Sequence, residues 1–369
     1  MSVSDRWTDL LRESGYEPGA ELGSGMEGTV ISLGDDLVAK IWHGRGATEL
    51  ETLQTFYKAL CGSGAAFDAP DILQILCLQE QCATVERLLR GRPLSTSTDA
   101  GSRTLDDHQI DCITAVLGSL AAVDAVPDMG VLPILDDEPR FDTQSTPFEL
   151  SLAHLVERRV EKFHGPLSAR LPGLDQVAAS VVDRLADLEA AKPCLVHGDL
   201  IPANILVDDT SRLVAVLDFG FMSTVGDPAF DATITASVYD MYGPRAMQNE
   251  ATLDIAIGQR FGYAASRLAV YRAAYALTTS NCFSASGHDG HFDWCLRMLD
   301  RPDIRDARRL TEACPGRAPT RLPEFARSGR ISRWVTCPDY RTSYGATSGH
   351  RRHLRAALVR RRIAIAERV

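Results

Sequence analysis

A chain of 369 residues is long enough for two lobes and a large buried core. Its hydrophobic content of 45% and charged content of 24% are ordinary for a soluble globular protein. The net charge of −10 is unevenly distributed, because residues 301–369 hold 17 Arg, no Lys and six acidic side chains, which leaves −21 on residues 1–300. An acidic body argues against nucleic acid as the partner and favours a cationic ligand, although the charge can equally serve solubility alone.

The cysteines and the apolar stretches bear on the cellular compartment in which the protein is expected. Nine Cys are present without any CxxC pair, which predicts reduced thiols rather than a disulfide framework or a zinc site. The polar N-terminus has no signal-peptide core, and apolar stretches such as residues 113–126 are too short and interrupted to cross a bilayer. We therefore expect a cytoplasmic protein that makes no contact with a membrane.

A glycine-rich turn lies near the N-terminus. Gly23, Gly25 and Gly28 follow the GxGxxG pattern, with Ser24 between the first two glycines. A strand-like segment, 29–33, comes next, whereas a dinucleotide-binding unit would continue into a helix. Glycines let the main chain close over phosphate groups, so this turn is predicted to form a phosphate lid. A merely flexible hairpin turn is the alternative.

The segment after this turn supplies a cation and an acid. A predicted strand at 37–42 carries Lys40, which could reach the α and β phosphates of a nucleotide as a point charge. A helix is predicted over residues 46–60, and its periodicity places Glu49 at the edge of the apolar stripe and Glu51 toward water. We expect Glu49 to hold Lys40 in place, the alternative being that both acids are exposed.

Two further apolar runs, 72–78 and 82–88, would complete a five-stranded sheet. The second run leads into a link marked by Gly and Pro at 91–93, which is typical of a hinge between lobes. Main-chain groups of Glu86 and Leu88 are expected to contact the purine of a nucleotide there.

The remaining chain predicts a helical lobe and a basic tail. The fold class is α+β with two lobes: a small β-rich lobe over residues 1–88, a larger helical lobe over 89–300, and an Arg-rich tail over 301–369 that is poorly ordered or loosely packed. A basic arm for nucleic acid or a membrane surface, a segment docked on the acidic body and a mis-called reading frame are alternatives for the tail. Helices are predicted at residues 105–126, 150–163, 177–191, 233–242, 251–261 and 266–283.

Two apolar runs each lead into an acidic residue. Residues 194–196 precede Asp199, residues 213–217 precede Asp218, and Asn204 lies five positions after Asp199. A phosphoryl-transfer site needs one carboxylate to orient the attacking hydroxyl, and an amide and a second carboxylate to hold magnesium on the phosphates. These residues therefore predict such a site, the alternative being that both acids only cap turns.

These segments resemble the aminoglycoside phosphotransferase and choline kinase-like family, a branch of the protein-kinase fold. The resemblance spans roughly residues 15–300 and implies ATP or GTP as phosphate donor and magnesium as metal. Two departures from protein kinases, Ile201 in place of Lys after the catalytic Asp and no Ala-Pro-Glu after Asp218, suit the small-molecule branch. The matching pieces are GSGMEG at 23–28, Lys40, VHGDLIPAN at 196–204, LDFG at 217–220 and GDPAFD at 226–231.

The resemblance assigns roles to single residues. It implies that Asp199 is the catalytic base and that Asn204 and Asp218 bind the metal. It also implies that His197 is a structural member of the catalytic loop and that Asp231 braces this loop.

The expected activity is an ATP-dependent transfer of the γ-phosphate to a hydroxyl of a small molecule. An aminoglycoside or another antibiotic is one class of acceptor, and a choline-like amine or a sugar is another. A nucleotide-binding pseudokinase that serves as an interaction module is the alternative from a different class. Residues 284–295, which include His288 and His291, are expected to form a surface loop, with a substrate-facing acidic loop or a metal site as alternatives.

Overall fold

The computed structural model of the protein describes residues 3–25, 27–95 and 105–309. Its N-terminal lobe is an antiparallel five-stranded sheet in the order β1-β2-β3-β5-β4, as the sequence predicts. The strands are β1 (Glu21–Ser24), β2 (Gly28–Ser32), β3 (Leu37–Trp42), β4 (Ile72–Leu78) and β5 (Gln81–Arg87).

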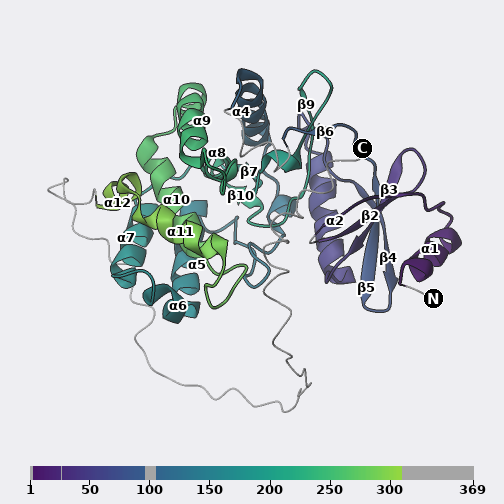
Figure 1. Cartoon of the computed structure of the whole chain (residues 1–369), viewed down its shortest axis with the longest axis horizontal. Coiled ribbons are helices and arrows are strands. Elements are labelled where there is room, and N and C mark those ends of the chain that lie inside the picture. The colour runs from purple at the N-terminus through teal and green to yellow at the C-terminus, as the bar shows by residue number, and fades with distance from the viewer. Residues whose placement is uncertain (1–2, 26, 96–104, 310–369) are drawn as a thin grey trace, which may run out of the picture.

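One helix covers each face of this sheet, so the sheet lies between α1 (Val3–Glu13) and α2 (Ala47–Cys61) in Figure 1. Side chains of a strand alternate between the two faces. Ala39 and Ile41 of β3 accordingly pack with Leu11 and Trp7 of α1, whereas Trp42 joins the core that α2 shares with the second lobe. Lys40, two residues before Trp42 in β3, lies on the same face of the sheet, under α2.

The C-terminal lobe is mainly helical, as predicted, and lies on the opposite side of α2 from the sheet (Figure 1). Helix α7 ends at Ala186, five residues before the predicted end, and α8 begins at Pro228, five residues before the predicted start. The helices are α4 (Asp107–Ala122), α5 (Phe148–Lys162), α6 (His164–Ser168), α7 (Leu174–Ala186), α8 (Pro228–Val238), α9 (Ala246–Phe261), α10 (Ala265–Thr279), α11 (Gly290–Asp300) and α12 (Pro302–Arg309), with 3-10 turns η1 (Pro127–Gly130) and η2 (Pro202–Asn204).

Two small sheets hold the loops of this lobe. One pairs β7 with β10, and the other has the order β6-β8-β9. The strands are β6 (Arg92–Pro93), β7 (Cys194–Val196), β8 (Ile205–Val207), β9 (Leu213–Val216) and β10 (Thr224–Gly226).

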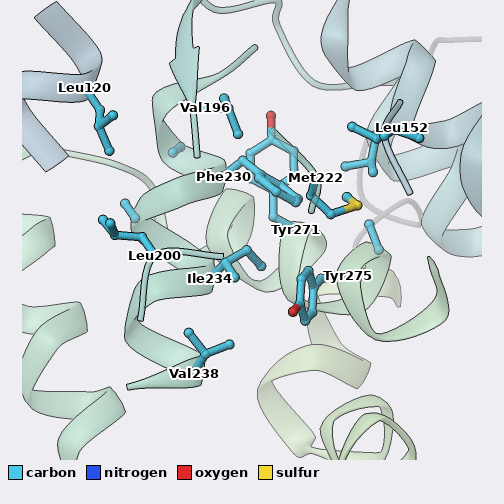
Figure 2. Packing of buried hydrophobic residues seen from close by; sticks show 14 of the residues in the cluster. Leu120, Leu152, Val196, Leu200, Met222, Phe230, Ile234, Val238, Tyr271 and Tyr275 are labelled. Carbon is cyan, nitrogen blue, oxygen red and sulfur yellow. The ribbon is translucent and has the colours of Figure 1, made fainter. Parts of the chain in front are cut away.

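An aromatic core lies directly beneath these loops. The ring of Phe230 packs edge-on against those of Phe148 and Tyr271, at centroid distances of 5.3 and 5.6 Å. Figure 2 shows Phe230 and Tyr271 beside Met222, with Val196 of β7 above them. Tight packing of this kind fixes β7 and the loop that begins at residue 197.

The lobes are joined by both side chains and main chain. Phe219 lies in the C-terminal lobe and packs against Phe56 and Tyr57 of α2, with ring centroids 5.4 and 6.2 Å apart. Asp68, which follows α2, exchanges main-chain hydrogen bonds with Val214 and Val216 of β9. The sheet and the catalytic loops are therefore held in a fixed relation.

Two expectations are wrong. Cys77 and Cys82 face each other across the β4–β5 hairpin and form a disulfide, because register places their Cα atoms 4.1 Å apart. The helical lobe also continues past residue 300, since α12 buries Ile304 and Ala307 against the rest of the lobe. The rest of the predicted tail, residues 310–369, lies outside the described residues. Within the described residues, no helix is long and apolar enough to span a membrane.

Candidate active site

The candidate catalytic loop begins where β7 ends. This short strand is fully buried and pairs with β10, so residues 197–204 start from a fixed edge. Gly198 adopts a φ of +84°, and a Cβ at this position would come within 2.5 Å of the Met222 main chain. Only glycine fits this approach without displacing the neighbouring loop.

His197 links this loop to the candidate metal loop, which comprises residues 218–223. Its Nδ1 accepts the N–H of Asp199 at 3.2 Å, and its Nε2 lies 2.8 Å from the carbonyl oxygen of Leu217. Since Nδ1 accepts, Nε2 carries the proton and donates to Leu217. Complete burial lowers the pKa of His197, so the ring stays neutral and acts as a structural bridge.

Asp231 at the start of α8 holds the same loop from below. Its two carboxylate oxygens accept the N–H groups of His197 and Gly198 at 2.7 and 2.8 Å. Burial raises the pKa of this carboxyl to about 6, against the opposing effect of the two N–H donors. The geometry agrees with the bracing role that the family resemblance implies.

Ser223 makes a second connection between the two loops. Its hydroxyl donates to the carbonyl oxygen of His197 at 2.6 Å and accepts the N–H of Gly220 at 2.8 Å. Leu217 N–H donates to the carbonyl oxygen of Asn204 at 2.8 Å. The segments that carry Asp199 and Asp218 thus form one hydrogen-bonded unit.

Asn204 and Asp218 line one pocket of about 250 Å³ that faces the sheet. Asn204 donates through Nδ2 to the main-chain oxygen of Asp199 at 3.1 Å, so its amide oxygen is the atom suited to a cation. Asp218 adopts a φ of +64° and has an exposed side chain. Hard oxygen donors in this pair fit Mg²⁺, and the two residues could hold it together.

Asp199 is positioned by these contacts without lining the pocket. Its main chain is bonded to His197 and Asn204, and its side chain is partly exposed. Asn204 and Asp218 thus line the same pocket and Asp199 is bonded to Asn204, while the roles predicted for the three residues remain predictions.

The glycine turn closes the pocket from the sheet side. Gly25 and Gly28 line it, and Gly25 N–H donates to the carbonyl oxygen of Gly28 at 2.8 Å. Gly23 lies in β1, as does Ser24, whose hydroxyl is 3.0 Å from that of Thr29. The position of the turn above the pocket agrees with the predicted lid.

Lys40 lines the same pocket but pairs with an acid other than the predicted one. Its Nζ lies 2.8 Å from Oε2 of Glu27, in the glycine turn, and Glu27 also accepts from Arg45 at 2.9 Å. Burial alone would raise the pKa of Glu27, but the neighbouring Lys40 and Arg45 lower it to about 2. Glu27 is therefore ionised, with two cations beside it.

The predicted pairing of Glu49 with Lys40 is wrong. Glu49 is exposed in the first turn of α2, where its carboxylate accepts the N–H of Gly46 at 2.7 Å. This capping role satisfies a main-chain donor at the helix start and turns the side chain away from the pocket. Tyr57, two turns further along α2, is the residue of this helix that lines the pocket.

Glu86 and Leu88, which are predicted to contact a purine through their main chains, both line the pocket, and these contacts remain predictions. Leu88 N–H donates to the carbonyl oxygen of Asp36 at 2.8 Å, so the protein already uses this donor. Glu86 is paired in register with Val38 and presents its buried side chain to the pocket, where it accepts from the Thr84 hydroxyl. Burial raises the pKa of Glu86, while Lys40 opposes this change.

Residues 284–295 contain less loop than predicted, because α11 begins at Gly290 with Asp289 as its N-cap. His291 is buried and stacks on Trp294, whereas His288 is exposed and bonds to Ser286. Within the part of the chain that the structure describes, no group of three or more His, Cys, Asp or Glu side chains is arranged to hold a metal. The metal alternative for this segment therefore has no support.

Sequence reasoning missed three residues of the site: Glu27, Arg45 and Ser223. Glu27 lies inside the predicted glycine lid, and its charge in a turn expected to cover phosphates was the available signal. Arg45 and Ser223 lie in short turns with no periodicity or spacing to mark them. Their contacts depend on how distant segments meet.

The fold and the site together define a phosphotransferase with a kinase-like architecture. The model of the phosphotransferase enzyme family (APH) matches residues 19–269, which is more than half of the chain. The protein belongs to this family of phosphotransferases.

Comparison with solved structures agrees on the fold. The macrolide 2'-phosphotransferase of Brachybacterium faecium is 20% identical with a TM-score of 0.53, and the match covers 81% of this chain and 99% of that chain. The aminoglycoside 2'-phosphotransferase-IIIa, in its GDP complex, is 17% identical with a TM-score of 0.53, with coverage of 83% and 99%. A comparison with curated protein sequences gives no match.

Proposed function

We propose that the protein transfers the γ-phosphate of ATP or GTP to a hydroxyl of a small cationic molecule, with Mg²⁺ on the phosphates. One observation carries this proposal: Asp199, Asn204 and Asp218 belong to a single hydrogen-bonded unit that faces Lys40 across one pocket. A phosphoryl-transfer site needs these groups on opposite sides of a nucleotide.

In the proposed reaction, Asp199 orients the acceptor hydroxyl toward the γ-phosphorus. A lone pair of the hydroxyl oxygen forms the new O–P bond while the bond from that phosphorus to the β–γ bridging oxygen breaks. The electron pair of the broken bond leaves with the nucleoside diphosphate, and the hydroxyl proton passes to the Asp199 carboxylate. Lys40 binds phosphate oxygens, and Mg²⁺, when bound by Asn204 and Asp218, would neutralise their charge.

A segment with several acidic residues lies beside the candidate metal loop. Met222 in that loop donates its N–H to the carbonyl oxygen of Ile134 at 2.8 Å, which places residues 134–138 there. Asp136 is exposed, whereas Asp137 is paired with Arg159 and Lys162 at 2.7 and 2.8 Å. The support for a cationic acceptor is therefore the net charge of −21 on residues 1–300. Kanamycin is bound in the solved GDP complex of one structural neighbour, which is 16% identical with a TM-score of 0.51.

The test is release of nucleoside diphosphate in the presence of aminoglycosides, macrolides, choline-like amines and sugars. We expect turnover with at least one cationic acceptor. Replacing Asp199 by Ala should reduce this turnover at least about a hundredfold, because the hydroxyl loses its orienting base. Nucleotide binding, measured by calorimetry, should stay within a few-fold of the unmodified protein.

Asp209→Ala is the matched control, since Asp209 is an exposed acid in the turn between β8 and β9. Near-normal turnover in Asp199→Ala would contradict the role of this residue. Nucleotide binding without turnover on any acceptor would instead favour the pseudokinase alternative. Phosphorylation of only the sugars or neutral amino alcohols would contradict the cationic acceptor while leaving the phosphotransfer intact.

A further inference from the structure

Two cations of the N-terminal lobe are held over one aromatic ring. Nζ of Lys40 lies 3.8 Å from the centre of the Trp42 ring, and the guanidinium carbon of Arg45 lies 4.9 Å from it. The ring cannot turn freely, because Trp42 is buried and its indole N–H donates to the Thr84 hydroxyl at 2.9 Å. Arg45 comes from the turn between β3 and α2, so strand and turn place two positive charges side by side.

One carboxylate connects these cations. Oε2 of Glu27 accepts from Lys40 at 2.8 Å, and Oε1 of Glu27 accepts from Arg45 at 2.9 Å. Glu27 comes from the glycine lid, between Gly25 and Gly28, and lines the same pocket as Asp218. Its carboxylate bonds a Lys and an Arg in the pocket of the candidate metal ligand, which are contacts that a nucleotide phosphate could make in its place.

Arg45 lies next to the candidate metal loop. A Cβ placed on Gly220 would be 3.4 Å from Nη2 of Arg45, so the guanidinium directly adjoins the loop that begins at Asp218. Lys40 is fixed on the strand above the pocket. Of the phosphates in a nucleotide, the terminal one must lie next to both the metal and the acceptor.

We propose that Arg45 is a further phosphate-binding residue, which contacts the terminal phosphate of the nucleotide. We also propose that, in the nucleotide-free protein, the Glu27 carboxylate occupies the place of that phosphate. This proposal rests on the proposed function. Binding of the nucleotide displaces the Glu27 carboxylate, after which Lys40 and Arg45 bind the phosphate oxygens. The planar guanidinium suits the terminal phosphate because it can donate two parallel hydrogen bonds.

Calorimetric titration with ADP and with a non-hydrolysable ATP analogue, both with Mg²⁺, tests this assignment. Arg45→Gln should lower the affinity for the ATP analogue about tenfold or more, the loss typical of a hydrogen bond to a charged group, and leave ADP affinity within about twofold. Arg45→Lys should recover part of the affinity for the ATP analogue, because lysine restores the positive charge but not the two parallel hydrogen bonds of the guanidinium. Equal losses for both nucleotides, or no loss for either, would overturn the proposal.

Glu27→Gln supplies the complementary measurement. Removing the competing negative charge should strengthen binding of both nucleotides several-fold, since Lys40 and Arg45 no longer hold an internal anion. Weaker binding of both nucleotides by Glu27→Gln would show that Glu27 is itself a ligand and not a substitute for the phosphate, and would overturn that half of the proposal.

Arg90→Gln is the control for loss of a surface charge, because Arg90 makes only exposed contacts with Asp35 and Asp36 in the structure described. It should leave both affinities unchanged. Thermal unfolding of each variant checks that the fold persists. If the unmodified protein binds neither nucleotide, the proposed function fails; if it binds both and Arg45→Gln has no selective effect, only the present inference fails.

Discussion

Asp231 shows how a single residue controls the site without touching a substrate. Its carboxylate is buried and accepts two N–H groups from the residues just before Asp199. An Asn in its place could accept from only one of them, because its other terminal atom is a donor. The catalytic loop is therefore sensitive to the chemistry of a side chain beneath it.

The raised pKa of Asp231 predicts a pH dependence of stability. The unfolded carboxyl titrates near 3.8 and the folded one near about 6, so between these values the folded state binds more protons. Stability attributable to Asp231 should then fall as pH rises, by up to about 3 kcal/mol from pH 4 to 7. Urea unfolding of the protein and of Asp231→Asn across this range gives the difference. A difference that is flat or increases with pH would contradict the assignment.

At the residue scale, motif spacing predicted more than helix periodicity did. Asn204 and Asp218, which come from the two motifs, line one pocket, and the roles predicted for them and for Asp199 remain predictions. Glu49 was misplaced, since periodicity identifies the face of a helix but not whether its first turn needs a cap. The partner of Lys40 is instead Glu27 of the glycine turn, and a turn has no hydrophobic periodicity from which the direction of a side chain could be predicted.

At the level of elements, α12 belongs to the folded lobe. Ile304 is fully buried and Ala307 nearly so, and Arg301, just before α12, pairs with Glu250 of α9 at 2.6 Å. An amphipathic helix of eight residues is stable here because the lobe covers its apolar face. The helical lobe thus extends beyond residue 300.

Two truncations test this extension. A chain ending at residue 309 should keep the unfolding free energy of the described lobes and their nucleotide binding. A chain ending at residue 300 should lose about 2–4 kcal/mol, mostly from burial of Ile304. Chemical denaturation of both chains measures this. Equal stability of the two would mean that α12 adds nothing to the fold.

Element types were predictable and element ends were not. The apolar period identified strands and most helices, whereas α7 and α8 each differ by five residues at one end. The start of α8 is set by the Asp227 cap and Pro228, which precede the apolar face that the period detects. The Cys77–Cys82 disulfide follows from strand register, which no cysteine spacing rule reveals.

On the scale of the whole molecule, Phe219 connects the lobes. It is almost fully buried between His197 of the catalytic loop and the aromatic pair Phe56 and Tyr57 of α2. Lys40 and Asp218 line one pocket, together with Tyr57 of this contact. The two-lobed class was readable from strands followed by helices, but this ring contact between distant segments was not.

Removing the Phe219 ring should weaken both stability and nucleotide binding. Phe219→Ala is expected to lower the unfolding free energy by about 3–5 kcal/mol, the usual cost of deleting a buried ring. Nucleotide affinity, measured by calorimetry, should fall in parallel because Lys40 and Asp218 lose their fixed relation. Leu73→Ala, at an exposed edge-strand position, is the control. A loss below about 1 kcal/mol would contradict this linking role.

The metal loop is short. Only residues 219–223 separate Asp218 from β10, and β10 pairs at once with the strand that leads to the catalytic loop. The Ser223 hydroxyl closes the loop onto both sides. A connection of this length has no room for a long segment that modification could fold or release. The loops that carry Asp199 and Asp218 are thus tied to each other within the C-terminal lobe itself, without a contribution from the N-terminal lobe.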